Sequence, residues 1–235
     1  MSLFLLQKRI GTYPWIAFPL FYAFGTRKHR AVSLSSDLVI EGFPRSANSF
    51  AVSAFRMAQD RAVSIATHLH QPCNVIRGIR LRKPVMLLIR DPISAVISLK
   101  SLYIEKRQRR VSSSTLFTPS FKDLFTWYTL FYESLLPYRN DVLVLRFEQV
   151  TRDFGKCIED LNRFYSTHFQ VFNHTPENVS TIFSKRFHIG PNDLREAIKQ
   201  QVHLDYEQSL PYIKYSVDQA RDTYYKFVNL DPSSL

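Results

Sequence analysis

Short apolar runs separated by amphipathic stretches make up the chain from residue 37 to residue 165. The run at residues 85–89, Val-Met-Leu-Leu-Ile, is apolar at every position, which is typical of a central parallel strand covered on both faces. Between such runs, apolar residues recur at intervals of three and four and predict helices. The predicted strands cover residues 37–41, 63–67, 85–89 and 142–147. The predicted helices cover residues 46–60, 72–81, 121–137 and 154–165, and a further helix begins at Asp91-Pro92.

This alternation of strands and helices predicts an α/β fold with a central parallel β-sheet flanked by helices, because parallel strands need a crossover helix between them. We expect a single domain over residues 1–235 with its core at residues 38–165. Residues 1–37 would form an N-terminal apolar and basic extension, and residues 166–235 a helical C-terminal part.

Two segments outside the regular pattern have their own predictions. The polar and basic stretch at residues 106–120 is predicted to be a long loop, and a loop of this length in a compact domain is often a lid or a binding segment. After residue 168 the pattern is irregular, and helices are predicted only near residues 193–202 and 217–228.

An apolar segment between basic residues occupies residues 13–24 near the N-terminus. It contains Pro14 and Pro19 and is too short to cross a bilayer, which takes ~20 apolar residues. No small-residue cleavage site of the signal-peptide kind is present. We expect the segment to pack against the core, and the alternative is an interfacial contact with a membrane.

Positive charge is concentrated in one part of the chain. The net charge is +11, and residues 76–110 hold ten Lys and Arg residues against two acidic residues. Such a field attracts phosphates, sulfates, nucleic acid or anionic lipid headgroups. The two cysteines, Cys73 and Cys157, indicate neither a disulfide framework nor a metal site, so we expect a reducing, cytoplasmic location, with peripheral membrane contact as an addition.

The stretch Glu-Gly-Phe-Pro-Arg-Ser-Ala-Asn-Ser-Phe at residues 41–50 joins a predicted strand to a predicted helix. Such a junction can bind an anion through backbone amides and the helix N-terminus. Aligned with the ATPase pattern Gly-x-x-x-x-Gly-Lys-Ser/Thr, it keeps the first Gly and the final Ser but has Ala47 and Asn48 in place of Gly-Lys. Because the Lys that normally reaches the β- and γ-phosphates is missing, binding of ATP with magnesium is not expected. Arg45 supplies a different cation, whose forked donors suit an oxyanion.

A second basic element stands at the next buried strand. Arg90 directly follows the apolar run at residues 85–89, and Ser98 lies two turns into the helix that follows. In an open parallel sheet, ligands collect at the carboxyl ends of the strands. A single nucleotide contacted by both strand ends would therefore place a phosphate group at each.

Together these elements resemble those of the sulfotransferases that use 3'-phosphoadenosine 5'-phosphosulfate (PAPS). The loop at residues 43–50 is similar to the family's 5'-phosphosulfate loop, and Arg90-Asp91-Pro92 with Ser98 is similar to its 3'-phosphate element. Thr67-His68-Leu69 resembles the segment that carries the family's catalytic base. The stretch at residues 145–150 resembles a later strand-end element, so the resemblance covers about residues 38 to 165 in the expected order.

The sequence also departs from the family pattern. Ala47 replaces the usual Gly, and Phe147 stands where relatives often have a Tyr, so that stacking on an adenine is retained without a hydroxyl contact. No clear match to the family's C-terminal basic-glycine element is present, and Lys185-Arg186 is a candidate for it on charge and order only.

The resemblance implies a fold of the P-loop-containing nucleotide-binding type and transfer of a sulfuryl group from PAPS, as co-substrate, to a hydroxyl or amine. His68 would be the general base, and Arg45 would hold the oxygens on which charge develops. No metal is expected, and the acceptor would be a small molecule, a glycan or a lipid rather than a nucleic acid. The expected co-substrate-binding residues are Arg45, Ser46, Ala47, Asn48, Ser49, Phe50, Arg90, Ser98 and Phe147.

Two other functions stay open at this point. A P-loop kinase or NTPase with a degenerate loop would need an acidic metal ligand at a strand end, where Asp91 stands. A non-catalytic basic module would bind nucleic acid or a membrane surface through residues 77–110 and the apolar N-terminal segment. A metal pair at His68 and His70 lacks a third ligand at useful spacing, so zinc is not expected.

Overall fold

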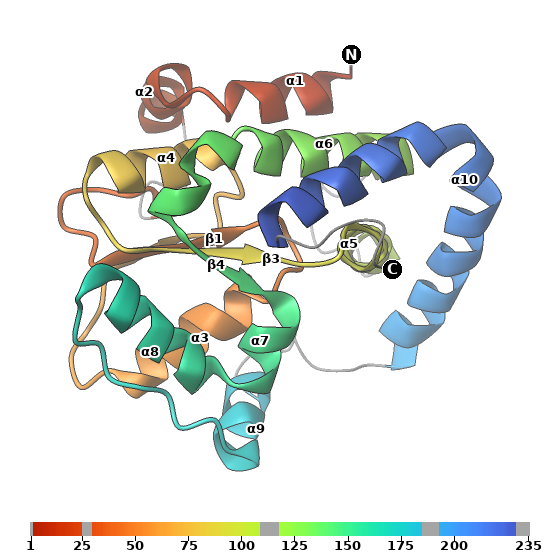
Figure 1. The fold of residues 1–235 in the computed structure, drawn as a ribbon. Helices are drawn as coiled ribbons and strands as arrows, with labels where there is room; N and C mark the ends of the chain where they lie inside the picture. Colours follow the sequence, from red (N-terminus) through yellow and green to blue (C-terminus); the bar gives the residue numbers. More distant parts are fainter. Residues whose placement is uncertain (1, 25–29, 109–117, 185–192, 229–235) are drawn as a thin grey trace.

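The computed structural model describes residues 2–24, 30–108, 118–184 and 193–228. At its centre lies a four-stranded sheet with the order β2-β1-β3-β4, in which every pair is parallel (Figure 1). The strands are β1 (Leu38–Gly42), β2 (Ile65–Thr67), β3 (Val85–Ile89) and β4 (Leu143–Arg146). Helices cover both faces of the sheet, which confirms the predicted α/β fold.

The helices form a layer on each face (Figure 1). One layer contains α4 and α6, with the N-terminal helices α1 and α2 packed outside them; the other contains α3, α8 and α9. The long helix α10 runs beside α5 and α6. The helical bounds are α1 (Leu3–Ile10), α2 (Pro14–Phe24), α3 (Asn48–Ala58), α4 (Pro72–Arg80), α5 (Pro92–Gln108), α6 (Phe121–Glu133), η3 (Leu136–Asp141), α7 (Phe147–Arg152), α8 (Phe154–Tyr165), α9 (Pro176–Ser184) and α10 (Asp193–Val228).

The strands divide the interior into two hydrophobic clusters because successive strand residues point to opposite faces. Val39 and Leu87 belong to the cluster beneath α4 and α6. Ile40 and Met86 belong to the cluster that packs on α3 and α8. All four side chains are fully buried, so both faces of the sheet are covered and an uninterrupted apolar strand is favoured.

Several boundaries differ from the prediction near the polar loops. Helix α5 continues to Gln108, so the first residues of the predicted 106–120 loop are helical, and residues 109–117 lie outside the described part of the chain. Phe147 begins α7 instead of ending a strand. The physical reason is the cap at Arg146, whose backbone N–H donates to Gln149 Oε1 at 2.9 Å and starts a helix directly after β4.

The C-terminal part contains more helix than predicted. Helix α9 lies in the stretch predicted to be irregular, and Thr175 Oγ1 caps its first turn by accepting from Asn178 N at 3.3 Å. Helix α10 has 36 residues, so the two short helices predicted there are one. Pro211 lies inside it without ending it, because the helix packs against α5 and α6 over its length.

The apolar N-terminal segment forms α2, which packs on α4 and buries Ala17 and Phe18 as expected. Its Trp15 nevertheless remains 72% exposed. Within the described ranges, none of the helices combines the length and the apolar character needed to cross a membrane.

Candidate functional site

A turn of residues 43–47, called here the β1 turn, leads from the end of β1 to the first turn of α3. Arg45 and Ala47 have φ angles of 73° and 68°, in the left-handed region. This conformation costs roughly 1 to 2 kcal/mol for a residue other than glycine, so neighbouring contacts must hold it. One of them is Asn48 Nδ2, which donates to Phe43 O at 3.0 Å and closes the turn on itself.

Two buried tyrosines of α6 hold the ends of β1 and β3 together. The Tyr132 hydroxyl donates to Leu88 O at 2.7 Å and accepts from Phe43 N at 3.2 Å. The Tyr128 hydroxyl donates to Arg90 O at 2.7 Å. The aromatic residues of α6 therefore position both strand ends through hydrogen bonds as well as through packing.

The two predicted cationic residues lie in direct contact. Arg45 Nε donates to Ser98 Oγ at 2.9 Å, and an Arg90 Nη donates to Arg45 O at 3.1 Å. The Arg90 guanidinium also lies over the Phe147 ring, with 3.9 Å from its central carbon to the ring centroid. The ends of β1, β3 and β4 and the second turn of α5 thus supply one cationic cluster.

Burial, together with repulsion from Arg195 and Arg90, lowers the pKa of Arg45 to about 10. Burial also lowers the pKa of Arg90, which attraction to Glu148 and Asp91 opposes. Both guanidinium groups still carry their charge at neutral pH. Two adjacent, partly desolvated cations favour an anionic ligand, because such a ligand removes their mutual repulsion.

The second turn follows β2 at residues 68–71 and is called here the β2 turn. His68 Nε2 lies 2.9 Å from Ser49 Oγ, at the start of α3, and His68 Nδ1 lies 3.0 Å from Thr67 Oγ1. Each ring nitrogen of His68 therefore faces a hydroxyl group, and the ring joins the β2 turn to the helix that begins after the β1 turn. His68 has a φ of 60°, so this turn is also left-handed at a residue other than glycine.

Glu41, a residue of β1, holds the β2 turn from beneath. Its carboxylate accepts from Leu69 N at 2.8 Å, His70 N at 3.2 Å and Asn74 Nδ2 at 3.0 Å. The side chain is fully buried, and desolvation raises the pKa of Glu41 to about 7 despite these hydrogen bonds. The sequence prediction missed this residue, because a single acidic residue in a predicted strand does not indicate that its carboxylate is buried and accepts hydrogen bonds.

His70 has a structural contact of its own. Its Nδ1–H donates to Gly42 O at 2.8 Å, and burial lowers the pKa of His70 to about 3, so the ring is neutral. The Asp91 carboxylate accepts from Ser94 N at 2.8 Å and caps α5. Over the described ranges, no group of three His, Cys, Asp or Glu side chains is placed to hold a metal ion.

The structure does not bring every predicted residue to this cluster. The Phe50 ring packs in the core against Phe154 and Phe183, so only its backbone faces the turn region. Ser46 and Asn48 are also buried, and the binding roles predicted for them stay predictions. The predicted residues that do lie in contact form two groups: Arg45, Arg90, Ser98 and Phe147 in the cationic cluster, and Ser49 with His68.

A buried ion pair joins α10 to α5. Arg195 Nε donates to Glu105 Oε2 at 2.8 Å and an Arg195 Nη donates to Glu105 Oε1 at 3.2 Å, and both side chains are buried. Repulsion from Arg195 contributes to the lowered pKa of Arg45, and attraction to Glu105 opposes it. The predicted candidate for a C-terminal basic element, Lys185-Arg186, lies outside the described residues.

No protein-family model matches the chain, and no curated protein matches it in sequence. Among solved structures, the chain is similar to mouse sulfotransferase SULT7A1 complexed with PAP, at 11% sequence identity and a TM-score of 0.44. The match covers 66% of this chain and 65% of that one, so the chain spans less than two thirds of the length of the solved protein. A similarity this distant concerns the course of the backbone and assigns no residue.

Proposed function

We propose that the protein is a sulfotransferase that transfers a sulfuryl group from PAPS to a hydroxyl or amine acceptor. The observation that carries the proposal is the contact between Arg45, Arg90 and Ser98, which come from two neighbouring strand ends and the helix that follows β3. A donor with a phosphate at each end needs cations at two strand ends that lie close together. The donor carries about four negative charges, which two guanidinium groups and the α3 N-terminus would partly neutralise.

In the proposed reaction, the acceptor oxygen or nitrogen forms a bond to sulfur while the bond from sulfur to the bridging phosphate oxygen breaks. Arg45 holds the oxygens that gain charge, and adenosine 3',5'-bisphosphate leaves. The acceptor proton passes to His68 Nε2. A base in this role contributes ~10²-fold to 10⁴-fold in rate.

The contact between Ser49 and His68 fits this sequence of events. With Nδ1–H donated to Thr67 Oγ1, His68 Nε2 is an acceptor, and the Ser49 hydroxyl donates to it across 2.9 Å. A phosphate oxygen at the start of α3 is a stronger acceptor than imidazole and draws the Ser49 hydroxyl toward itself. Donor binding would then release Nε2 for the acceptor proton.

The test is isothermal titration with adenosine 3',5'-bisphosphate in the presence of a chelator. We expect binding by the native protein and by His68→Ala, and a loss of ~100-fold or more in Arg45→Ala and Arg90→Ala, since hydrogen bonds to charged groups are worth about 1.5 to 3 kcal/mol each. Arg56→Ala, an exposed arginine at the other end of α3, is the matched control and keeps native affinity.

ATP with magnesium forms the second arm of this titration. If ATP with magnesium bound more tightly than the bisphosphate, the kinase or NTPase function would replace the proposal. Turnover is measured by mass spectrometry of a metabolite pool incubated with PAPS, in which an acceptor gains the mass of one sulfate. The His68→Ala protein binds the bisphosphate and loses this turnover; native turnover in that variant would contradict the role given to His68.

A further inference from the structure

The N-terminal helix α2 presents apolar side chains to solvent as well as to the protein. Its sequence, Pro-Trp-Ile-Ala-Phe-Pro-Leu-Phe-Tyr-Ala-Phe, contains no charged residue. Ala17 and Phe18 are buried, whereas Trp15, Leu20 and Tyr22 are 72%, 44% and 38% exposed. The outer face of α2 is therefore an unpartnered apolar face on a helix whose inner face is already packed.

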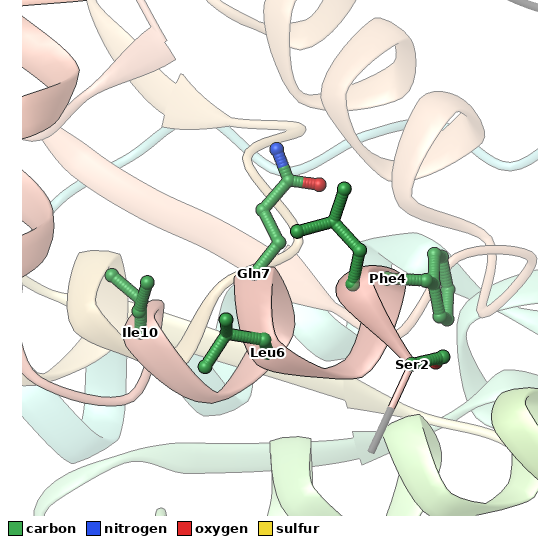
Figure 2. Close-up of a pocket in the computed structure, with 6 residues that line it drawn as sticks. Ser2, Phe4, Leu6, Gln7 and Ile10 are labelled. Carbon is green, nitrogen blue, oxygen red and sulfur yellow. The ribbon is translucent and has the colours of Figure 1, made fainter.

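Helix α1 continues this apolar surface. Its Lys8 lies over the ring of Trp127 at 3.9 Å, which fixes the inner side of the helix on α6. Leu3 and Leu6 are 82% and 41% exposed on α1. A hollow of about 490 Å³ lies on α1 and is lined by Ser2, Leu3, Phe4, Leu6, Gln7 and Ile10. Figure 2 shows Leu6 and Ile10 one turn apart along the helix.

Basic residues lie on α1 and on α4, the helix on which α2 packs. Arg77 on α4 lies over the Phe18 ring at 4.2 Å, and Arg9 and Arg80 are exposed. Neither residues 2–36 nor residues 61–90 contain an Asp or a Glu. Among the described residues, Asp123 on α6 contacts α1, where its carboxylate accepts a hydrogen bond from Ser2 Oγ at 3.0 Å. The helices α1, α2 and α4 therefore combine exposed apolar groups with positive charge alone.

We propose that this α1–α2 surface docks the protein onto membranes that contain anionic lipids. Apolar and aromatic side chains such as Trp15 and Tyr22 enter the region between headgroups and acyl chains, and the arginines pair with lipid phosphates. The 11 residues of α2 are too few to cross the bilayer, so the helix lies in the plane of the interface. Charge complementarity selects an anionic lipid surface over a protein partner, whose surface normally offers both signs of charge.

Vesicle sedimentation tests the proposal with the whole chain. Vesicles of phosphatidylcholine alone are compared with vesicles that also contain phosphatidylglycerol, and we expect binding to the second kind that weakens as salt is added. Trp15 is an intrinsic probe, because Trp127, the other tryptophan, is 4% exposed. Trp15 fluorescence shifts to the blue on binding and is quenched by lipids with brominated acyl chains.

The variant Trp15→Ser/Leu20→Ser removes two exposed apolar groups and should lower vesicle binding by about tenfold or more. Arg9→Gln/Arg80→Gln should lower binding by about tenfold on anionic vesicles and leave binding to neutral vesicles unchanged. The matched control Tyr212→Ser/Tyr215→Ser changes two residues of α10 that are 87% and 74% exposed and keeps native binding.

Three results would overturn the proposal. The first is failure of the native protein to bind anionic vesicles at low salt. The second is an equal loss of binding in the Tyr212→Ser/Tyr215→Ser control. The third is a dimer in light scattering that Trp15→Ser/Leu20→Ser converts to a monomer, because a second copy of the chain would then cover this face.

Discussion

The β1 turn and the β2 turn reach neighbouring positions at the edge of the sheet, but they are held in different ways. Several elements hold the β1 turn, through Tyr132, Asn48 and Arg90. At the β2 turn, the buried carboxylate of Glu41 accepts both backbone amide hydrogens of Leu69 and His70, while the imidazole rings contact Ser49 and Gly42 O. Both turns pass through left-handed residues other than glycine, so each needs its contacts to persist.

In the proposed function, this difference separates donor binding at the β1 turn from proton transfer at the β2 turn. The β1 turn carries the cations, and its contacts involve groups that do not titrate near neutral pH. The β2 turn carries His68, and the group that supports it, Glu41, has a pKa raised to about 7 by burial. Conditions that change the charge of Glu41 should therefore affect the position of His68 before they affect Arg45 and Arg90.

Glu41→Leu is the strongest way to separate the two turns. It leaves the Leu69 and His70 amides and the Asn74 side chain without this acceptor, and we expect a loss of about 3 to 5 kcal/mol in the free energy of unfolding. Urea denaturation measures the loss. Affinity for adenosine 3',5'-bisphosphate should stay within a few-fold of native, while turnover falls with the position of His68.

Glu41→Gln is the control for this substitution, because it keeps one oxygen acceptor and the shape of the side chain. The free energy of unfolding of Glu41→Gln should fall by less than half as much as that of Glu41→Leu. If Glu41→Leu lost donor affinity as strongly as turnover, the two turns would be one cooperative unit and the comparison would be wrong.

The sequence predicted best those features that are encoded locally. The strand at residues 85–89 and the helix at residues 154–165 have the predicted bounds, because an uninterrupted apolar run and a helical period are readable without knowledge of neighbours. The sequence predicted that Arg45 and Arg90 lie at the carboxyl ends of two parallel strands, which end at one edge of the sheet. Their direct contact, and that of Arg45 with Ser98, was not predicted.

Long-range contacts were not predictable in this way. Glu105 and Arg195 are 90 positions apart and pair only because α10 packs on α5. The continuity of α10 through Pro211 likewise depends on packing, which overrides the helix-breaking tendency of proline. The strand residue Glu41 is an ordinary acid in sequence, and its role becomes visible only when the β2 turn lies over it.

Tyr132→Phe tests the β1 turn. The substitution removes the hydroxyl that joins Phe43 N to Leu88 O and keeps the buried ring. We expect a loss of about 2 kcal/mol in the free energy of unfolding, because a buried N–H loses its acceptor. Bisphosphate affinity should fall along with stability. Tyr212→Phe, at a residue that is 87% exposed, is the matched control and should change neither quantity; an equal loss in that control would remove the role given to Tyr132.

His70→Asn tests the pH dependence of the β2 turn. The pKa of His70 is about 3 in the fold, below its ordinary value near 6.5, because burial disfavours the charged ring. The unfolded chain therefore binds a proton that the folded chain does not, and stability is lost as the pH falls from about 6.5 toward about 3. The raised pKa of Glu41 acts in the opposite direction, since it stabilises the fold as the pH falls from about 7 toward 4.5.

Asparagine tolerates the left-handed φ of 52° and can still donate to Gly42 O. Between pH 7 and about pH 5, the free energy of unfolding of the native protein should fall by about 1 to 2 kcal/mol more than that of the variant. This is less than the full pKa shift implies, because 22% of the His70 side chain is exposed. Urea denaturation of both proteins at the two pH values measures the difference. Parallel losses in the two proteins would show that His70 does not titrate as described.

Ala47→Gly has the smallest expected effect on stability. The sign of the change shows whether the left-handed backbone at residue 47 is strained. Ala47 has a φ of 68°, where glycine avoids a cost of about 1 kcal/mol, and the added freedom of the unfolded chain offsets most of that gain. We therefore expect a change between zero and about 1 kcal/mol of added stability. The same substitution at Ala51, inside α3, should instead destabilise by about 1 kcal/mol, since glycine has a low helix propensity.

Thermal unfolding of the two glycine variants beside the native protein measures both changes. If Ala47→Gly stabilises the protein and Ala51→Gly destabilises it, the backbone strain lies in the β1 turn and not in α3. The hydrogen bonds of the β1 turn must then balance that strain. Equal destabilisation at Ala47 and Ala51 would show that the left-handed turn is not strained, and the need for the contacts of Tyr132, Asn48 and Arg90 would disappear with it.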